Sequence, residues 1–372
     1  MCKRIYKEQT SEQGDVPFFK IGTFGANPDA FISNELFEDF KCIYPYPTPG
    51  TLLISAAGSI GRVVEYQGEK AYFQDSNIVW LEHDHRLNDA FLKPLYSRIE
   101  WGLEGSTIKR LYNKDLLSAE VTVPGGREQK EIGQFFAKLD NLITLHQRKY
   151  DKLCVLKKSM LDKMFPKGGS LYPEIRFSGF TDPWEQRKLE NYVVVSTTKN
   201  VDGKFGKEDV LSVSGEYGVV NQITFQGRSF AGASVSNYGV VNTGDVVYTK
   251  SPLNSNPYGI IKVNKGIPGI VSTLYAIYHP RDNVYANFIQ VYFEQHKRMN
   301  NYMHPLVNKG AKNDMKVTAE NALKGMVTFP SREEQSVISA FFSRLDSLIT
   351  LHQRKLELLR NIKKSMLDKM FV

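Results

Sequence analysis

Residues 135–165 read FFAKLDNLITLHQRKYDKLCVLKKSMLDKMF, and residues 341–371 read FFSRLDSLITLHQRKLELLRNIKKSMLDKMF. Extended to 124–166 and 330–372, the two stretches share 26 identities in 43 gapless positions. An internal repeat of this strength indicates a chain built from two copies of one arrangement. Two dissimilar blocks precede the copies, so the order along the chain is variable, constant, variable, constant.

Each constant stretch has the pattern of a long helix. Apolar residues recur at alternating steps of four and three from Ile132 to Met164 and from Ile338 to Met370. This spacing predicts a coiled-coil seam, and two such helices in one chain most simply pair with each other. A second apolar line, formed by Phe135, Leu142 and Leu156, is expected to widen the seam.

The connection between the copies predicts the direction of the helices. Only 18 residues, 167–184, separate the first helix from the second variable block. Because the ends of a compact domain usually lie close together, the second helix should start near the end of the first and run antiparallel to it. About 40 helical residues give a rod of roughly 60 Å. We therefore expect a dumb-bell with an approximate two-fold axis.

The variable blocks are predicted to be mostly β. The first contains the runs TLLIS, RVVEY and NIVWLEH, and the second contains DVVYT, YGIIKV and LYAIYH, bounded by Gly, Pro and Asn. A helix should follow in each block, over 90–101 and 287–303. Each block then ends with a basic, glycine-led loop and a final strand, EVTV or GMVTF, so the blocks are interpreted as diverged copies of one domain.

The predicted fold class is therefore α+β, with two mostly-β domains that are each followed by a long helix. The predicted boundaries are 1–124 for the first domain, 125–166 for its helix, 167–183 for a linker, 184–330 for the second domain and 331–372 for its helix.

Composition narrows the function. The 372 residues carry a net charge of +8, and no apolar run approaches the ~20 residues that span a bilayer. Three distant cysteines give neither a disulfide framework nor a CxxC pair, which favours a cytoplasmic protein without structural zinc. The basic surplus lies in the helices: 127–167 hold 10 basic and 5 acidic residues, 332–372 hold 8 and 5, and 1–126 are net acidic, with 13 and 17.

Catalytic motifs are not evident. The sequence has no GxxxxGK[ST] phosphate loop. Asn256-Pro257-Tyr258 lacks one proline of the adenine-methylase motif and has no glycine-rich cofactor loop near it, so a turn is the favoured interpretation. His83-Asp84-His85 is interpreted as a loop after a strand, because no third ligand follows at zinc spacing.

Four elements together resemble the specificity subunit of type I restriction–modification systems. They are the paired LITLHQRK and KKSMLDKMF stretches, ISAAGSIGRV at 54–63, and PEIRFSGFTDPWEQRKL at 173–189. The resemblance implies a non-catalytic subunit whose two target-recognition domains each read one half of a bipartite, asymmetric site in double-stranded DNA. It further implies helices that act as a ruler and dock two methyltransferase subunits, which restriction/translocase subunits join.

The resemblance also implies that this chain binds no cofactor itself, because S-adenosylmethionine, ATP and Mg²⁺ are expected on the partner subunits. No membrane partner is expected. A coiled-coil adaptor whose two β-rich modules bind proteins rather than DNA is the alternative from another class.

The run PEIRFSGFTDPWEQRKL occurs once, before the second variable block, and nothing like it precedes the first. Whether this difference reflects a truncation or a native start stays open. So does the question whether a methyltransferase docks in the same way at both ends.

Candidate DNA-binding residues lie in two loops of each block and are of types that meet phosphates or base edges. In the first block they are Ser55, Ser59, Arg62, Ser106, Thr107, Lys109 and Arg110. In the second they are Lys250, Ser251, Asn254, Asn256, Lys309, Lys312 and Asn313. For each residue, a solvated turn position is the competing interpretation. Tyr238, Tyr248 and Tyr258 could contact a base, but packing is favoured for them.

Candidate subunit-interface residues lie at equivalent helix positions: His146, Arg148, Lys157, His352, Arg354 and Lys363. For the two histidines, the favoured interpretation is a polar residue that sets the register of the helix pair, and partner contact is the alternative. The two lysines could instead extend their stems over apolar surface and leave their charges in solvent.

Overall fold

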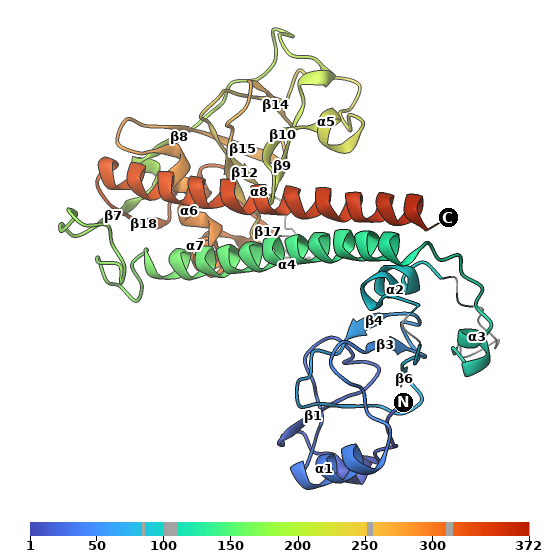
Figure 1. Cartoon of the computed structure of the whole chain (residues 1–372). Coiled ribbons are helices and arrows are strands. Elements are labelled where there is room, and N and C mark those ends of the chain that lie inside the picture. The colour runs from blue at the N-terminus through green and yellow to red at the C-terminus, as the bar shows by residue number, and fades with distance from the viewer. Residues whose placement is uncertain (84–85, 100, 102–109, 251–255, 310–314, 372) are drawn as a thin grey trace. The chain divides into compact units, whose positions relative to one another are not determined.

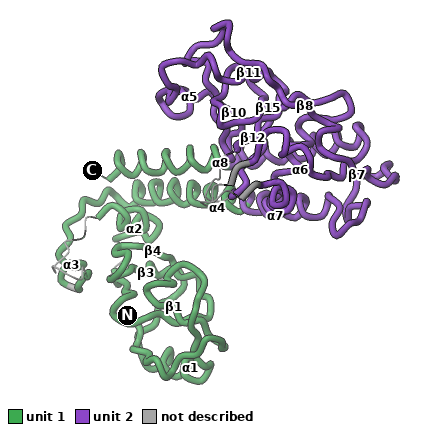
Figure 2. Tube along the Cα trace, turned by 180° about the vertical axis from the view of Figure 1, so that it is seen from behind, with its two compact units in different colours: residues 1–148, 353–372 green, residues 149–352 purple. Residues whose placement is uncertain are grey.

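The computed structural model describes residues 1–371 except 84–85, 100, 102–109, 251–255 and 310–314 (Figure 1). The chain divides into two compact units (Figure 2). The first unit is 1–148 together with 353–372, and the second is 149–352. Both units share the two long helices, α4 (Gly126–Lys163) and α8 (Arg332–Met370). Each unit therefore consists of one variable block and a part of each helix.

The helices run antiparallel, as the sequence predicts. In the first unit, Nζ of Lys363, near the end of α8, lies 2.5 Å from Oδ1 of Asp140, in the first half of α4. In the second unit, Nζ of Lys157, near the end of α4, lies 2.6 Å from Oδ1 of Asp346 on α8. Lys157 and Lys363 are equivalent positions of the repeat, and so are the two aspartates. The same ion pair therefore forms twice: once with the lysine on α4 and the aspartate on α8, and once with the lysine on α8 and the aspartate on α4.

The first unit begins with small sheets. Its elements before α4 are a 3₁₀ helix (Lys7–Gln9), β1 (Val16–Phe19), β2 (Phe31–Ile32), α1 (Asn34–Ile43), β3 (Leu52–Ser55), β4 (Val63–Glu65), β5 (Tyr72–Phe73), β6 (Ile78–Val79), α2 (Asp89–Tyr96) and α3 (Asn113–Leu117). One sheet has the order β2-β1-β5, in which β1 pairs antiparallel with β2 and parallel with β5. The other is the antiparallel sheet β4-β3-β6.

Aromatic rings join the helices to the core of the first unit. Phe371, just after α8, has its ring centroid 5.4 Å from that of Phe91 on α2 and 5.9 Å from that of Phe136 on α4. Phe91 and Phe136 are fully buried. The end of the second repeat helix thus packs against the domain that precedes the first repeat helix, because the antiparallel arrangement brings it back there.

The second unit contains more strands. Its strands are β7 (Glu185–Lys188), β8 (Val193–Val195), β9 (Leu211–Ser214), β10 (Gly218–Asn221), β11 (Gly239–Val241), β12 (Val246–Thr249), β13 (Ile261–Val263), β14 (Gly269–Val271), β15 (Tyr275–Pro280), β16 (Asn308–Lys309), β17 (Met315–Lys316) and β18 (Met326–Phe329). Its main sheet has the antiparallel order β13-β12-β15-β8. The pairs β10-β9, β11-β14, β16-β17 and β18-β7 are separate and also antiparallel.

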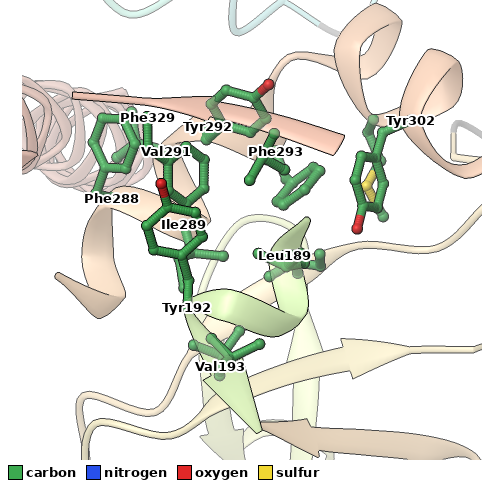
Figure 3. Close-up of a cluster of buried hydrophobic side chains, with 14 of the residues drawn as sticks. Leu189, Tyr192, Val193, Phe288, Ile289, Val291, Tyr292, Phe293, Tyr302 and Phe329 are labelled. Carbon is green, nitrogen blue, oxygen red and sulfur yellow. The ribbon is translucent and has the colours of Figure 1, made fainter. Parts of the chain in front are cut away.

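The helices of the second unit pack on its sheets. They are α5 (Gln222–Gln226), α6 (Ala286–Glu294) and α7 (His296–Met303), with 3₁₀ turns at Leu189–Asn191, Lys207–Asp209, His304–Leu306 and Asn321–Leu323. Figure 3 shows Phe288 and Tyr292 of α6 beside Phe329 of β18 in the buried cluster. Phe165, the repeat equivalent of Phe371, packs here against Phe288 and Phe342 at 5.9 and 6.2 Å. Each unit therefore contains a cluster of three phenylalanine rings, one after or at the end of a repeat helix, one on the other repeat helix and one on the domain helix.

Three predicted elements differ from the structure. The helix expected over 90–101 ends at Tyr96, and the one expected over 287–303 is broken at Gln295 into α6 and α7. The prediction of a final strand at EVTV in the first block is wrong, because the structure describes residues 120–123 and they form no strand. Its counterpart β18 is held by β7, and the first unit has no equivalent of β7 in its described part.

The prediction that a second apolar line on the first repeat helix widens the seam is also wrong. Phe135, Leu142 and Leu156 are all exposed, whereas Phe136 and Leu139 are buried. The line lies on a face that α8 does not cover, so it leaves apolar surface on the outside of the helix pair.

Candidate nucleic-acid interface and helix pair

The loop between β3 and β4 is shaped by its own hydroxyl and glycine residues. Ser55 is buried; its Oγ donates to the carbonyl of Ser59 and accepts the backbone N–H of Arg62 at 2.9 Å. Gly61 has φ +79°, and a Cβ there would lie 2.8 Å from the ring of Trp101. Ser55 therefore fixes the loop from within. Ser59 and Arg62 are exposed at its surface, where the guanidinium of Arg62 donates to the carbonyl of Gly25 at 3.2 Å.

Arg110 is brought to the same loop. The backbone of Ala56 accepts the N–H of Leu111 at 2.8 Å and donates to the carbonyl of Asn77 at 2.8 Å. The guanidinium of Arg110 donates to the carbonyl of Ser76 at 3.1 Å. Backbone hydrogen bonds thus place Arg110 beside the segment that carries Arg62.

The equivalent position in the second unit holds a pair of lysines. Lys250 follows β12 as Ala56 follows β3, and it is half-buried. Burial lowers the pKa of Lys250, and the positive charge of Lys199 lowers it further. The carboxylate of Glu320 raises the pKa of Lys250 in part. Lysines commonly contact phosphates, so anion binding by this pair is a prediction. Lys199 was missed by the sequence reasoning because it lies 51 residues from Lys250.

The Asn256-Pro257-Tyr258 motif forms a turn, as predicted. The carbonyl of Asn256 accepts the N–H of Gly259 at 2.9 Å. Gly259 has φ +76°, and a Cβ there would lie 1.9 Å from the carbonyl oxygen of Thr249, so only glycine fits. The hydroxyl of Tyr248 donates to the carbonyl of Tyr258 at 2.8 Å. Tyr248 is buried, which confirms packing for this ring.

Half of the predicted DNA-binding residues lie outside the described residues. These are Ser106, Thr107, Lys109, Ser251, Asn254, Lys312 and Asn313, together with Asp84 and His85 of the histidine loop. Lys309 is described only as part of the backbone of β16. DNA contact by any residue of the set stays a prediction.

The two helix lysines are ion-paired. Nζ of Lys157 lies 2.6 Å from Asp346 and 2.6 Å from Glu294 on α6, and its side chain is only 17% exposed. Burial lowers the pKa of Lys157, but the two carboxylates outweigh burial and raise it above its ordinary value. Lys363 pairs with Asp140, where both side chains are about one-third exposed. Their ammonium groups therefore do not simply extend into solvent.

The other helix candidates are less constrained. His146 and His352 are half-buried at equivalent positions, each in its own unit. Arg148 and Arg354 are exposed. These placements suit both a role in setting the register and contact with a partner.

A buried glutamine joins the first domain to its helix. Oε1 of Gln129 accepts the backbone N–H of Asn88, the N-cap of α2, at 3.0 Å. Its Nε2 donates to the carbonyls of Arg86 at 3.2 Å and Pro124 at 2.9 Å. One amide thus connects α4, the start of α2 and the chain that leads into α4.

Gln335, the repeat equivalent, makes the same three contacts. Its Oε1 accepts the N–H of Tyr285, the N-cap of α6, at 2.9 Å. Its Nε2 donates to the carbonyls of Pro330 at 2.9 Å and Asn283 at 3.5 Å. The two domains are therefore fixed to their helices by one device, although their sequences differ. The sequence reasoning missed it, although both glutamines are among the 26 identities.

Metal-ligand clusters and membrane-spanning helices were sought among the described residues. No group of three or more His, Cys, Asp or Glu side chains there is placed to hold a metal ion. Among the described helices, none has the length and hydrophobicity of a membrane span.

Part of the chain is similar in sequence to proteins of a known class. Residues 1–154 match the family described as the type I restriction modification DNA specificity domain. A Haemophilus influenzae protein named as a type I restriction enzyme specificity subunit is 51% identical over 144 residues, which are 38% of this chain and 37% of that protein. The match thus spans little more than a third of that relative's length.

The fold comparison covers the entire chain. The S subunit of a type I restriction–modification system from M. genitalium aligns with 100% of this chain and 92% of its own, with a TM-score of 0.61 and 15% identity. The resemblance that the sequence predicts is confirmed. The chain is similar to type I specificity subunits, over residues 1–154 by sequence and over its length by fold.

Proposed function

We propose that the chain is the DNA-sequence-specificity subunit of a type I restriction–modification complex. It recognises a bipartite, asymmetric site in double-stranded DNA, one half per domain, and directs adenine methyltransferase and restriction subunits to it. It is itself non-catalytic and acts in the cytoplasm.

The duplication is the observation that carries this proposal. Two domains of unlike sequence are each attached, through Gln129 or Gln335, to one helix of an antiparallel pair. Two recognition domains of unlike sequence, held by two equivalent helices, suit a DNA site made of two different half-sites. The similarity to specificity subunits supports the same function.

We assign DNA recognition to the loops that follow β3 and β12. Arg62 and Arg110 in the first domain, and Lys199 and Lys250 in the second, supply the charges for phosphates and guanine edges. Asn256 and the remaining predicted residues of these loops complete the set.

Methyltransferase subunits are proposed to dock on the helices. Leu142 and Leu145 are exposed in the first unit, and their repeat equivalents Leu348 and Leu351 are exposed in the second. Leu348 lines a shallow hollow with Ser343, Arg344 and Ser347. Two equivalent apolar patches suit two copies of one partner. S-adenosylmethionine, ATP and Mg²⁺ then belong to the partner subunits.

A binding experiment separates this function from a protein-binding adaptor. The chain, alone and with its methyltransferase subunit, is incubated with random genomic duplex, and the retained fragments are sequenced. Enrichment of one bipartite sequence supports the proposal. No sequence selection at low salt would leave the adaptor as the better explanation.

The ruler role has its own test. Inserting seven residues at matching places in α4 and α8 keeps the seam in register and adds about 10 Å, or roughly 3 base pairs. Sequencing of methylated adenines should show the same half-sites with a longer spacer. An unchanged spacer would contradict the ruler.

A further inference from the structure

In the first domain, the turn before β6 is held against the loop that follows β3. The carbonyl of Asn77, the residue before β6, accepts the N–H of Ala56, the residue after β3, at 2.8 Å. The guanidinium of Arg110 donates to the carbonyl of the neighbouring Ser76 at 3.1 Å. Ser76 has φ +50°, a backbone conformation that side-chain-bearing residues rarely adopt. Asn77 therefore lies beside the loop to which DNA recognition is assigned.

The second domain places Leu274 at the equivalent position. Strand β15 pairs antiparallel with β12, as β6 pairs with β3. The carbonyl of Leu274, the residue before β15, accepts the N–H of Lys250, the residue after β12, at 3.2 Å. Asn77 and Leu274 are therefore equivalent in the fold, although no sequence similarity joins their segments.

The hydrogen bonds at this position use main-chain groups, and the side chains extend from the domain edge. Leu274 is 63% exposed, and Asn77 is half-buried. A single exposed leucine is ordinary on a protein surface, so exposure alone indicates no function. The surroundings of Leu274 are more informative. Burial and then the charge of Lys199 lower the pKa of its partner Lys250, so two ammonium groups lie near this leucine.

We propose that Asn77 and Leu274 are specificity-determining residues that contact base edges in the major groove, one in each half-site. Asn77 recognises adenine, because a side-chain amide can donate to N7 and accept from the N6 amino group. Leu274 recognises thymine, whose C5 methyl group is the apolar group that the major groove offers. This inference rests on the proposed function and adds the residues that distinguish the bases.

The difference between the two side chains favours DNA over a protein as the partner. A protein that bound both domains alike would need the same chemistry at two equivalent positions, but one is an amide and the other is aliphatic. Two different half-sites require such a difference. The neighbouring cations, Arg110 in one domain and Lys250 in the other, suit phosphates on either side of a contacted base.

The test of Leu274 uses the full complex with its methyltransferase subunit and the bipartite duplex that it selects. Each thymine of the duplex is replaced in turn by uracil, which lacks only the C5 methyl group. At one position, uracil should weaken binding roughly fourfold, the effect of one buried methyl group. Leu274→Ala should bind the thymine duplex more weakly by a similar factor and should not distinguish uracil from thymine there.

Ile267→Ala is the matched control in the same domain. Ile267 is 72% exposed and lies in the loop after β13. The carbonyl of Asn264 in that loop accepts the N–H of Gly244, which precedes β12, so the loop lies at the end of β12 opposite to Lys250. The Ile267→Ala complex should retain the full response to uracil.

Asn77 is tested with 7-deazaadenine, in which a C–H group replaces the N7 acceptor. At one adenine of the other half-site, this base should weaken binding of the unaltered complex about fivefold or more. Asn77→Ala should remove the difference between adenine and 7-deazaadenine at that position. Its main-chain bond to Ala56 does not involve the side chain, so its thermal unfolding should match that of the unaltered chain.

Several results would overturn the assignment. One is an unaltered complex that responds to neither modified base at any position, a result that needs no variant. Another is a Leu274→Ala complex that still distinguishes uracil, or that assembles poorly with the methyltransferase while selecting the same sequence, which would indicate a protein contact. If the unaltered complex selects no sequence, the proposed function fails and the assignment fails with it. A selected sequence that is insensitive to these changes contradicts the assignment alone.

Discussion

Gln129 and Gln335 show how one buried amide can hold a domain against a helix. Each satisfies a backbone N–H at a helix N-cap and two backbone carbonyls, so both polar atoms of the amide are used. The surrounding residues differ between the units, yet the partners are all main-chain groups. Main-chain partners tolerate sequence change, which explains how unlike domains share one attachment.

Replacing Gln335 by Ala should destabilise the second unit. The change leaves a buried N–H and two carbonyls without partners, at a cost of about 1–3 kcal/mol for an unsatisfied group. Denaturant unfolding of the full chain, followed by hydrogen exchange in each unit, measures it. Gln134→Ala, on the exposed side of α4, is the control and should change little. Equal effects of the two substitutions would contradict the role of the buried amide.

The cysteines of the first unit should react very differently. Cys2 is buried, and burial raises the pKa of its thiol to about 11, whereas Cys42 is exposed. Only the thiolate is nucleophilic, so iodoacetamide at neutral pH should modify Cys42 first and Cys2 only after unfolding. Mass spectrometry of the proteolytic peptides over time measures the order in which the two cysteines are modified.

The same shift gives a pH dependence of stability. The pKa of Cys2 is higher in the folded than in the unfolded state, so folded protein retains the proton longer. The free energy of unfolding of the first unit should therefore fall as pH rises above the ordinary thiol value toward 11. Cys2→Ala should remove this part of the dependence, and an unchanged profile would argue against the raised pKa.

The repeat helices are alike in sequence but differ in how their ends are held. Lys157 bridges Asp346 on α8 and Glu294 on α6, whereas Lys363 has Asp140 as its carboxylate partner. Glu294 is itself partly buried, and one of its oxygens is buried with no hydrogen-bond partner among the described residues. Lys157 near the end of α4 therefore reaches its neighbouring domain, whereas the end of α8 reaches its own through Asp368, whose carboxylate lies 2.9 Å from Arg98.

Lys157→Ala should accordingly cost more stability than Lys363→Ala. Removing Lys157 leaves two carboxylates close together in a poorly hydrated site, which costs about 3 kcal/mol. Removing Lys363 breaks a partly exposed pair, worth roughly 1 kcal/mol or less. Thermal unfolding of the two full-length variants compares them. Equal losses would mean that Glu294 does not contribute.

The helices were predictable because their signal is periodic and repeated. The pairing of Asp140 with Lys363 follows once the direction is known, although neither residue stands out alone. The strand at 120–123 was predicted wrongly from a pattern that is sound, because a strand also needs a neighbour to accept its hydrogen bonds. Arg62 and Lys250 could be named from sequence, but Lys199 could not, since only the fold brings it to Lys250.

Charge is distributed unevenly over the protein as a whole. The repeat stretches carry the net surplus of the chain, and residues 1–126 are net acidic. If the helices contact spacer phosphates, non-specific affinity arises there, and discrimination between sequences arises in the loops. Affinity and specificity should then be separable by substitution.

Replacing the exposed Lys149, Lys152 and Lys158 of α4 by Gln should test this separation. Binding of the complex should weaken for all duplexes alike, and the slope of log affinity against log salt should fall by about 0.9 for each phosphate that is no longer neutralised. The methylated sequence should not change. Lys250→Gln is the contrasting variant and should alter the preference for one half-site. A change of sequence preference in the helix variant would contradict the assignment.

The packing of Phe371 on Phe91 has a consequence for synthesis of the protein on the ribosome. The first domain emerges before the second, but its core and helix contacts wait for residues 353–371, which are translated after the whole of the second unit. The second unit, residues 149–352, is complete earlier. A nonsense codon just after residue 352 would therefore damage the first unit, although its domain was synthesised earlier, and leave the second unit nearly intact.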